Sequence, residues 1–108
     1  MKLSQTQILL GKFLQELGLC DEDEPMFEYR FDDGRKWRAD VALPSKSLLF
    51  EIEGGAWTRG RHTRGKGFLA DLEKYNTATL CGWRVIRFSP EQVKSGWAKT
   101  FLDEWVGD

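Results

Sequence analysis

The stretch WRADVALPSKSLLFEIE, residues 37–53, has the pattern of two β-strands joined by a tight turn. Apolar and β-branched residues dominate both halves, while Pro-Ser-Lys-Ser in the middle has the composition of a turn. A hairpin folded about Ser45 and Lys46 predicts that Asp40 lies opposite Glu51. We therefore expect antiparallel strands at residues 37–43 and 48–53.

This hairpin gathers carboxylates. Side chains alternate between the two faces of a strand, so Asp40, Glu51 and Glu53 are expected on one face. Like charges opposite each other destabilise a sheet unless a cation compensates. Mg²⁺ would do so through Asp40 and Glu51, with the backbone carbonyl of Ile52 and the Glu53 carboxylate as further ligands. A structural alternative is that Arg38, opposite Glu53 in this register, neutralises that acid.

Composition indicates a single globular domain over residues 1–108, with a real but modest core. The net charge of −1 gives no overall attraction to nucleic acid, so any attraction must come from a local patch. Cys20 and Cys81 lie far apart and form no metal-binding spacing, which favours reduced, buried thiols. Without a signal peptide or a membrane-length apolar run, we expect a cytoplasmic protein that does not contact membranes.

The remaining elements follow from caps, turns and periodicity. Ser4 caps a helix that Gly18 ends, and Asp33-Gly34 is typical of a two-residue hairpin turn. The apolar stretch at residues 83–88 suggests a more central strand, and Ser89-Pro90 opens the last helix. The predicted order is α-β-β-β-α-β-α, with helices at residues 4–17, 68–81 and 89–106, and strands at residues 27–31, 37–43, 48–53 and 83–88.

Two helical stripes are expected to face the core. The last helix would bury Val93, Trp97, Phe101 and Trp105. In the middle helix, Asn76 lies within the apolar stripe and Lys74 points away from it. The stripe of that middle helix consists of Phe68, Leu69, Leu72, Thr79 and Leu80.

A basic loop follows Glu53 directly. It contains cations and two aromatic rings but no acid, which suits a phosphate backbone and a stacked base. An exposed charged loop without a role is the alternative, and the position beside the acidic strand favours nucleic-acid contact. The predicted contact residues are Trp57, Arg59, Arg61, His62, Arg64 and Lys66.

With these residues assembled, the chain resembles the PD-(D/E)XK, or restriction-endonuclease-like, nucleases. It is most similar to small single-domain members of the very-short-patch-repair and phage-encoded kinds. The resemblance rests on Asp40, on Glu51-Ile52-Glu53, and on the helix that precedes Gly-Trp-Arg-Val at residues 82–85. It implies an α/β (α+β) fold with a mixed four-stranded sheet flanked by helices. It also implies that Asp40 and Glu51 bind Mg²⁺ or Mn²⁺ and that the substrate is DNA.

The chain departs from the family motif at two positions. Ala39 replaces the proline, and Glu53 replaces the lysine that serves as general base and charge stabiliser. Some family members carry an acid at the latter position, where it acts as a ligand or base. Members with a migrated motif supply the ammonium from the helix instead, a role that Lys74 or Lys66 would take here.

Three functions are consistent with this sequence. The leading one is a metal-dependent DNA endonuclease in which Asp40, Glu51, Glu53 and Lys74 form the catalytic site. A catalytically inactive nuclease-fold module that binds nucleic acid is the second, and its cause would be the lost lysine. The third is a protein-interaction domain that uses the Trp-rich last helix. A monomer of this size has one cutting centre, so a double-strand break would need a homodimer or two visits.

Overall fold

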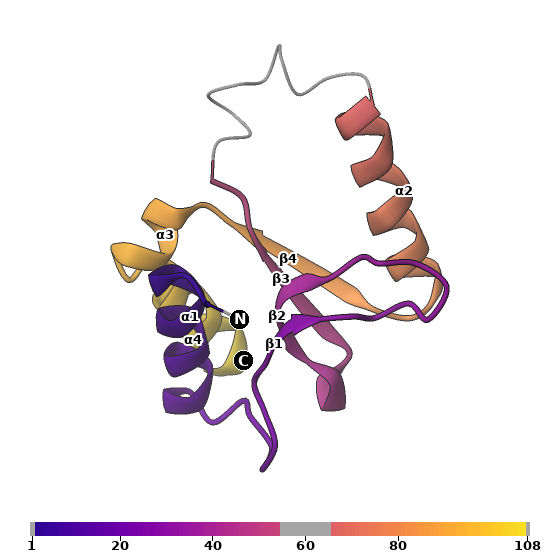
Figure 1. The fold of residues 1–108 in the computed structure, drawn as a ribbon. Coiled ribbons are helices and arrows are strands. Elements are labelled where there is room, and N and C mark those ends of the chain that lie inside the picture. The colour runs from indigo at the N-terminus through magenta and orange to yellow at the C-terminus, as the bar shows by residue number, and fades with distance from the viewer. Residues whose placement is uncertain (1, 55–65, 108) are drawn as a thin grey trace.

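The computed structural model describes residues 2–54 and 66–107, which form an α+β fold around one mixed sheet (Figure 1). The strands follow the order β1-β2-β3-β4, in which β2 is antiparallel to both β1 and β3, and β4 is parallel to β3. The elements are α1 (Gln5–Glu16), β1 (Met26–Tyr29), β2 (Ala39–Leu43), the 3₁₀ turn η1 (Pro44–Lys46), β3 (Leu48–Ile52), α2 (Lys66–Leu80), β4 (Arg84–Phe88), α3 (Pro90–Lys94) and α4 (Trp97–Gly107).

The β2–β3 hairpin has the predicted register. Val41 lies opposite Phe50, and Leu43 lies opposite Leu48. The turn between them is η1, after which Ser47 adopts a left-handed conformation with φ of 54° and its N–H donates to the carbonyl of Pro44. This confirms the strand pairing on which the expected carboxylate face depends.

The main hydrophobic core lies on one face of the sheet, beneath α1, α3 and α4 (Figure 1). Alternate residues of β2 and β3 point into it, with Val41 and Phe50 fully buried against Leu10 and Leu14 of α1. The capping box between Ser4 and Gln7 starts α1, and Gly18 with φ of 72° follows its end. Most of the apolar burial, and therefore most of the hydrophobic stabilisation, is on this face.

The opposite face carries only a small apolar cluster, in which Ala42 and Leu49 of the sheet meet Ala78 of α2. The other side chains that β2 and β3 direct to this face are charged, because Asp40 and Glu51 alternate with the residues that enter the main core. Of the helices described, only α2 lies on this side of the sheet (Figure 1). The candidate site lies between the sheet and this helix.

The middle helix faces the sheet through a different side than predicted. Lys74 and Tyr75 are half-buried against the sheet, whereas Asn76 is exposed. The predicted stripe was wrong because the facing sheet surface is charged and attracts polar side chains of α2. The residues of that stripe are exposed: Phe68, Leu69, Leu72, Thr79 and Leu80.

Three further expectations need correction. The chain between β1 and β2 is a connection over residues 30–38 instead of a two-residue turn at Asp33-Gly34. Strand β4 lies at an edge of the described sheet, not at its centre. The last helix is divided into α3 and α4, because Gly96 between them has φ of 87°, which is outside the helical range.

The aromatic residues of α4 are less buried than expected. Val93 of α3 is fully buried, but Trp97, Phe101 and Trp105 of α4 keep 49, 45 and 44% of their surface exposed. Of the two cysteines, which are both free thiols, Cys20 is partly buried and Cys81 is exposed. Within residues 2–54 and 66–107, no helix has both the length and the apolar character needed to cross a membrane.

Candidate active site

Two carboxylates meet where the β2–β3 ladder ends. Asp40 on β2 accepts a hydrogen bond at Oδ2 from the backbone N–H of Ile52, at 2.7 Å. Glu51 lies next to Ile52 on β3, on the strand that pairs with β2, and the nearby Asp40 carboxylate raises the pKa of the Glu51 carboxyl. The backbone carbonyl of Asp40 accepts a bond of 3.0 Å from Nε2 of the buried Gln7, which ties this strand end to α1. The predicted meeting of Asp40 and Glu51 is therefore present.

Glu51 is unusually buried for an acid, with 7% of its surface exposed. Burial raises the pKa of its carboxyl group to about 7, and the Asp40 carboxylate adds to this rise. The Lys74 ammonium opposes the increase without cancelling it. Within residues 2–54 and 66–107, cations therefore compensate this pair of acids only in part, a state typical of functional sites.

Lys74 reaches the pair from α2. Its Nζ lies 2.9 Å from Oε1 of Glu51 and donates a 2.8 Å hydrogen bond to the backbone carbonyl of Arg38. One ammonium thus joins α2, the acidic pair and the chain that enters β2. Lys74 therefore lies on the side of α2 that faces the sheet. The apolar stripe had predicted the opposite side, whereas a lysine supplied from the helix in place of the one missing at position 53 would have to lie here.

Glu53 is engaged in a separate cluster beside the pair. Arg87 of β4 binds it through two nitrogens, with Nε 2.9 Å from Oε2 and one Nη 2.6 Å from Oε1. The Tyr75 hydroxyl lies 3.4 Å from Oε1 of Glu53, and the Arg87 guanidinium lies 4.5 Å from the Tyr75 ring centre. The bond to Glu53 raises the pKa of Arg87, and burial raises the pKa of Tyr75. The structural alternative that a cation neutralises Glu53 holds with a different partner, because Arg87 and not Arg38 pairs with this acid.

Arg87 and Tyr75 were not predicted as site residues. The parallel pairing of β3 with β4 makes Arg87 the direct neighbour of Glu51, on the same face. Strand alternation in WRVIRF predicts that Arg84 and Arg87 lie on different faces of the sheet. Placing Arg87 beside Glu51 also requires knowing that this strand pairs with β3. Tyr75 is next to Lys74 on α2. It was not predicted because the apolar stripe of this helix indicated that the other side of the helix faces the sheet.

The donor set fits a hard divalent cation through two carboxylates. In the described part of the chain, no group of three His, Cys, Asp or Glu side chains is arranged around one point. Glu53, predicted as a ligand, is turned to Arg87 instead. Mg²⁺ is commonly held by one or two carboxylates together with waters and substrate phosphates, so Asp40 and Glu51 suffice. The bonds to Ile52 and Lys74 use one oxygen of each carboxylate.

Most of the predicted nucleic-acid contacts lie outside the described residues. This applies to Trp57, Arg59, Arg61, His62 and Arg64. Lys66 begins α2, and its side chain is also outside the description. Contact of this loop with DNA stays a prediction.

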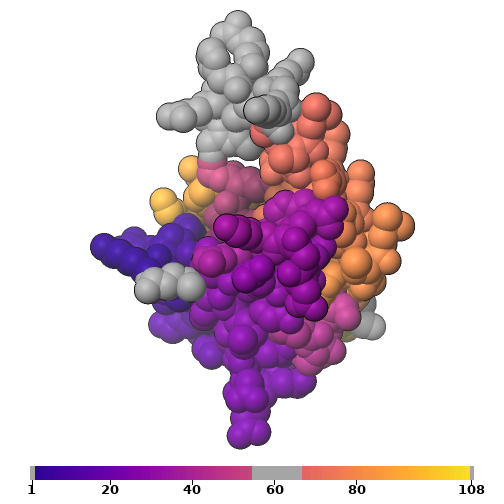
Figure 2. Space-filling model, turned by 45° about the vertical axis from the view of Figure 1, so that its right-hand side comes forward, coloured from indigo at the N-terminus to yellow at the C-terminus, as the bar shows by residue number. Residues whose placement is uncertain are grey.

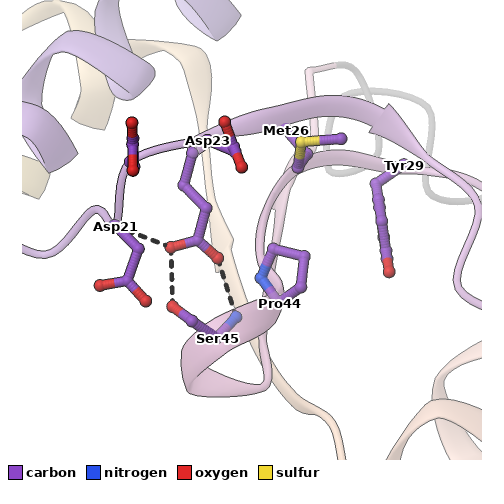
Figure 3. Close-up of a pocket in the computed structure, with 8 residues that line it drawn as sticks. Asp21, Asp23, Met26, Tyr29, Pro44 and Ser45 are labelled. Atoms are coloured by element: carbon purple, nitrogen blue, oxygen red, sulfur yellow. Dashed lines mark hydrogen bonds between the residues drawn. The ribbon is translucent and has the colours of Figure 1, made fainter.

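A hollow of about 440 Å³ lies away from this site, beside the acidic connector at residues 21–24 (Figure 3). Glu24 holds the connector to η1, because Oε2 accepts from the Ser45 N–H at 2.8 Å and Oε1 accepts from the Ser45 hydroxyl at 2.7 Å. Burial opposes ionisation of Glu24, but bonds from Ser45 and Asp21 outweigh it and lower the pKa of this carboxyl. Glu24 therefore has a structural role, in which it fixes the connector at residues 21–24 to η1.

Comparison of the chain with protein-family models, curated proteins and solved structures finds no match.

Proposed function

We propose that this protein is a metal-dependent DNA endonuclease with a restriction-endonuclease-like core. The observation that carries the proposal is the buried Glu51 beside Asp40, with the Lys74 ammonium 2.9 Å from Glu51. Two adjacent acids and one ammonium on a sheet face form the donor set needed for hydrolysis of a phosphodiester. The α+β sheet order is consistent with that core.

Asp40 and Glu51 would hold Mg²⁺ or Mn²⁺, with the Ile52 carbonyl as a further ligand. A cation bound there supplies a polarised phosphodiester oxygen and a water of lowered pKa. Lys74 favours the ionised form of the Glu51 carboxylate, since its charge opposes part of the effect of burial on the pKa of that group. The same ammonium is available to the negative charge that develops on the phosphoryl oxygens during attack.

Glu53 acts in this proposal as an orienting residue for Arg87. The side-on pair engages Nε and one Nη nitrogen of the guanidinium, as the two bonds to Glu53 indicate. An arginine has five N–H donors, so the other Nη nitrogen keeps its donors for a phosphate oxygen. The stack on Tyr75 limits the motion of the guanidinium further.

A module that binds DNA without cutting it is the alternative, motivated by the missing lysine at position 53. The ammonium of Lys74 beside Glu51 favours the enzyme, because it supplies the missing charge from α2. The two functions share a fold and a DNA partner, and they differ in one observable, which is metal-dependent strand scission.

A nicking assay tests this proposal. Supercoiled and branched DNA are incubated with Mg²⁺ or Mn²⁺, and EDTA serves as the metal-free control. We expect nicking by the wild-type chain and none by Asp40→Asn or Glu51→Gln, because each change removes a charged ligand while preserving side-chain shape. Lys94→Gln, an exposed change on α3, is the matched control and should nick normally. DNA binding without any nicking would favour the alternative.

A further inference from the structure

Residues 30–38, the loop of the β1–β2 hairpin, carry an excess of positive charge that was not predicted to be functional; this segment is called the basic hairpin below. It contains Arg30, Arg35, Lys36 and Arg38 against two acids, Asp32 and Asp33. All four cations are exposed. The whole chain has a net charge of −1, so this excess of positive charge is local. The preceding connector at residues 21–24 is entirely acidic, which leaves β1 between segments of opposite charge.

Aromatic rings hold the basic hairpin in one shape. Phe31 stacks on Trp37 with ring centres 6.2 Å apart, and Trp83 packs edge-on against Phe31 at 6.5 Å. Across the loop, the Arg30 guanidinium donates to the Arg35 carbonyl at 3.1 Å. A charged loop without a role has no need of such support, whereas a rigid loop binds a ligand with a smaller entropic cost.

The basic hairpin adjoins the candidate active site. Lys74 Nζ bonds both the Arg38 carbonyl and the Glu51 carboxylate, at 2.8 and 2.9 Å. Arg38 lies only two residues before Asp40. Farther out, Arg35 pairs with Glu73 of α2 at 3.3 Å. Figure 2 shows the purple atoms of this part of the chain at the surface, beside the salmon and orange atoms of α2.

The cations of the hairpin differ in how they are used. Arg35 is engaged by Asp32 and Glu73 and lies over the Trp37 ring, 4.7 Å from its centre. Lys36 and Arg38 form no ion pair with any residue in the described ranges. The loop is exposed and supported by aromatic rings, and it carries these two cations on the chain that leads into Asp40, which suits a polyanion that must reach the acidic pair.

We propose that the basic hairpin binds the phosphate backbone of the DNA substrate, with Lys36 and Arg38 as its contacts. This inference rests on the proposed function and adds a second anchoring surface to it. Cations on phosphates position a nucleic acid without reading its sequence. A strand held by Lys36 and Arg38 runs past Asp40, so its phosphodiesters are presented to the acidic pair.

The test measures DNA binding by the full chain as a function of salt, with fluorescent duplex and branched oligonucleotides. Titrations are made in EDTA and again with Ca²⁺ in place of Mg²⁺. Lys36→Ala plus Arg38→Ala should raise Kd by about tenfold or more per lost contact. Its plot of log K against log salt should be flatter by about 1.8, the value for two phosphate contacts.

A matched control separates this effect from a change in net charge. Lys12→Ala plus Lys94→Ala removes the same charge from exposed positions on α1 and α3, across the sheet from α2. This control should bind with nearly the wild-type Kd and salt slope. Lys36→Glu alone should weaken binding more than Lys36→Ala, which guards against misfolding of the double variant.

The outcomes for the two proposals are distinguishable. Equal Kd and equal salt slope in the hairpin and control variants would overturn the hairpin inference, even if the wild type nicks DNA. A wild-type chain that neither binds nor nicks DNA would overturn both. A selective loss in the hairpin variants supports the second anchoring surface whether or not nicking is observed.

Discussion

Two clusters of acids and cations lie side by side on the α2 face of the sheet, and their charges are matched to different degrees. In the first, the half-buried ammonium of Lys74 pairs with Glu51, and within the described residues it is the one cation paired with either Asp40 or Glu51. In the second, the Glu53 carboxylate accepts hydrogen bonds from two nitrogens of the Arg87 guanidinium and from the Tyr75 hydroxyl. The first cluster has an excess of acid that another cation would relieve, and the second has none. This difference assigns ligand roles to Asp40 and Glu51 and an orienting role to Glu53.

The largest expected effect concerns Lys74. Lys74→Met keeps an unbranched side chain only one atom shorter but removes the ammonium that pairs with Glu51. We expect the single-turnover nicking rate with Mg²⁺ to fall by about 10²–10³-fold, the usual result of losing one charge-stabilising group. Lys94→Met should leave the rate unchanged, and Lys74→Arg should restore part of it. A rate within twofold of wild type for Lys74→Met would remove this residue from the site.

A smaller effect is expected on the free energy of unfolding. Neutralising the acid of the first cluster with Glu51→Gln should raise it, whereas Glu53→Gln in the second cluster should lower it. Burial raises the pKa of Glu51 from 4.5 to about 7. Between these pH values the folded chain binds more protons than the unfolded chain, so stability falls as pH rises through this window. In EDTA at pH 8, Glu51→Gln should therefore be more stable than wild type by up to about 3 kcal/mol.

Urea unfolding at two pH values checks this prediction. At pH 5 most of the destabilisation is absent, so the advantage of Glu51→Gln should shrink to under about 1 kcal/mol. If Glu51→Gln were more stable than wild type by the same amount at both pH values, or less stable at pH 8, the claim that ionised Glu51 destabilises the fold would be contradicted.

Glu53→Gln is the comparison in the second cluster. It weakens a well-matched pair whose side chains are 27 and 49% exposed, so solvent screening limits the loss. We expect this variant to be less stable than wild type by no more than about 1 kcal/mol in the same urea titrations. A gain in stability similar to that of Glu51→Gln would mean that both acids are strained and that the comparison between the clusters fails.

The sequence predicted the β2–β3 hairpin and its register because strand alternation and a Pro-containing turn are local signals. Asp40 and Glu51 followed from that register. The sheet-facing side of α2 was not predictable from periodicity, since Phe68, Leu69 and Leu72 form an apolar stripe that the fold leaves exposed. Arg87 depended on a parallel pairing between strands separated by α2, which no local pattern specifies.

Metal binding measured by titration calorimetry tests the central claim most directly. Mn²⁺ and Mg²⁺ are titrated into wild type, Asp40→Asn, Glu51→Gln and Glu53→Gln. We predict one site in wild type and in Glu53→Gln, and none in Asp40→Asn or Glu51→Gln. Unchanged affinity in Glu51→Gln, or loss of the site in Glu53→Gln alone, would contradict the account.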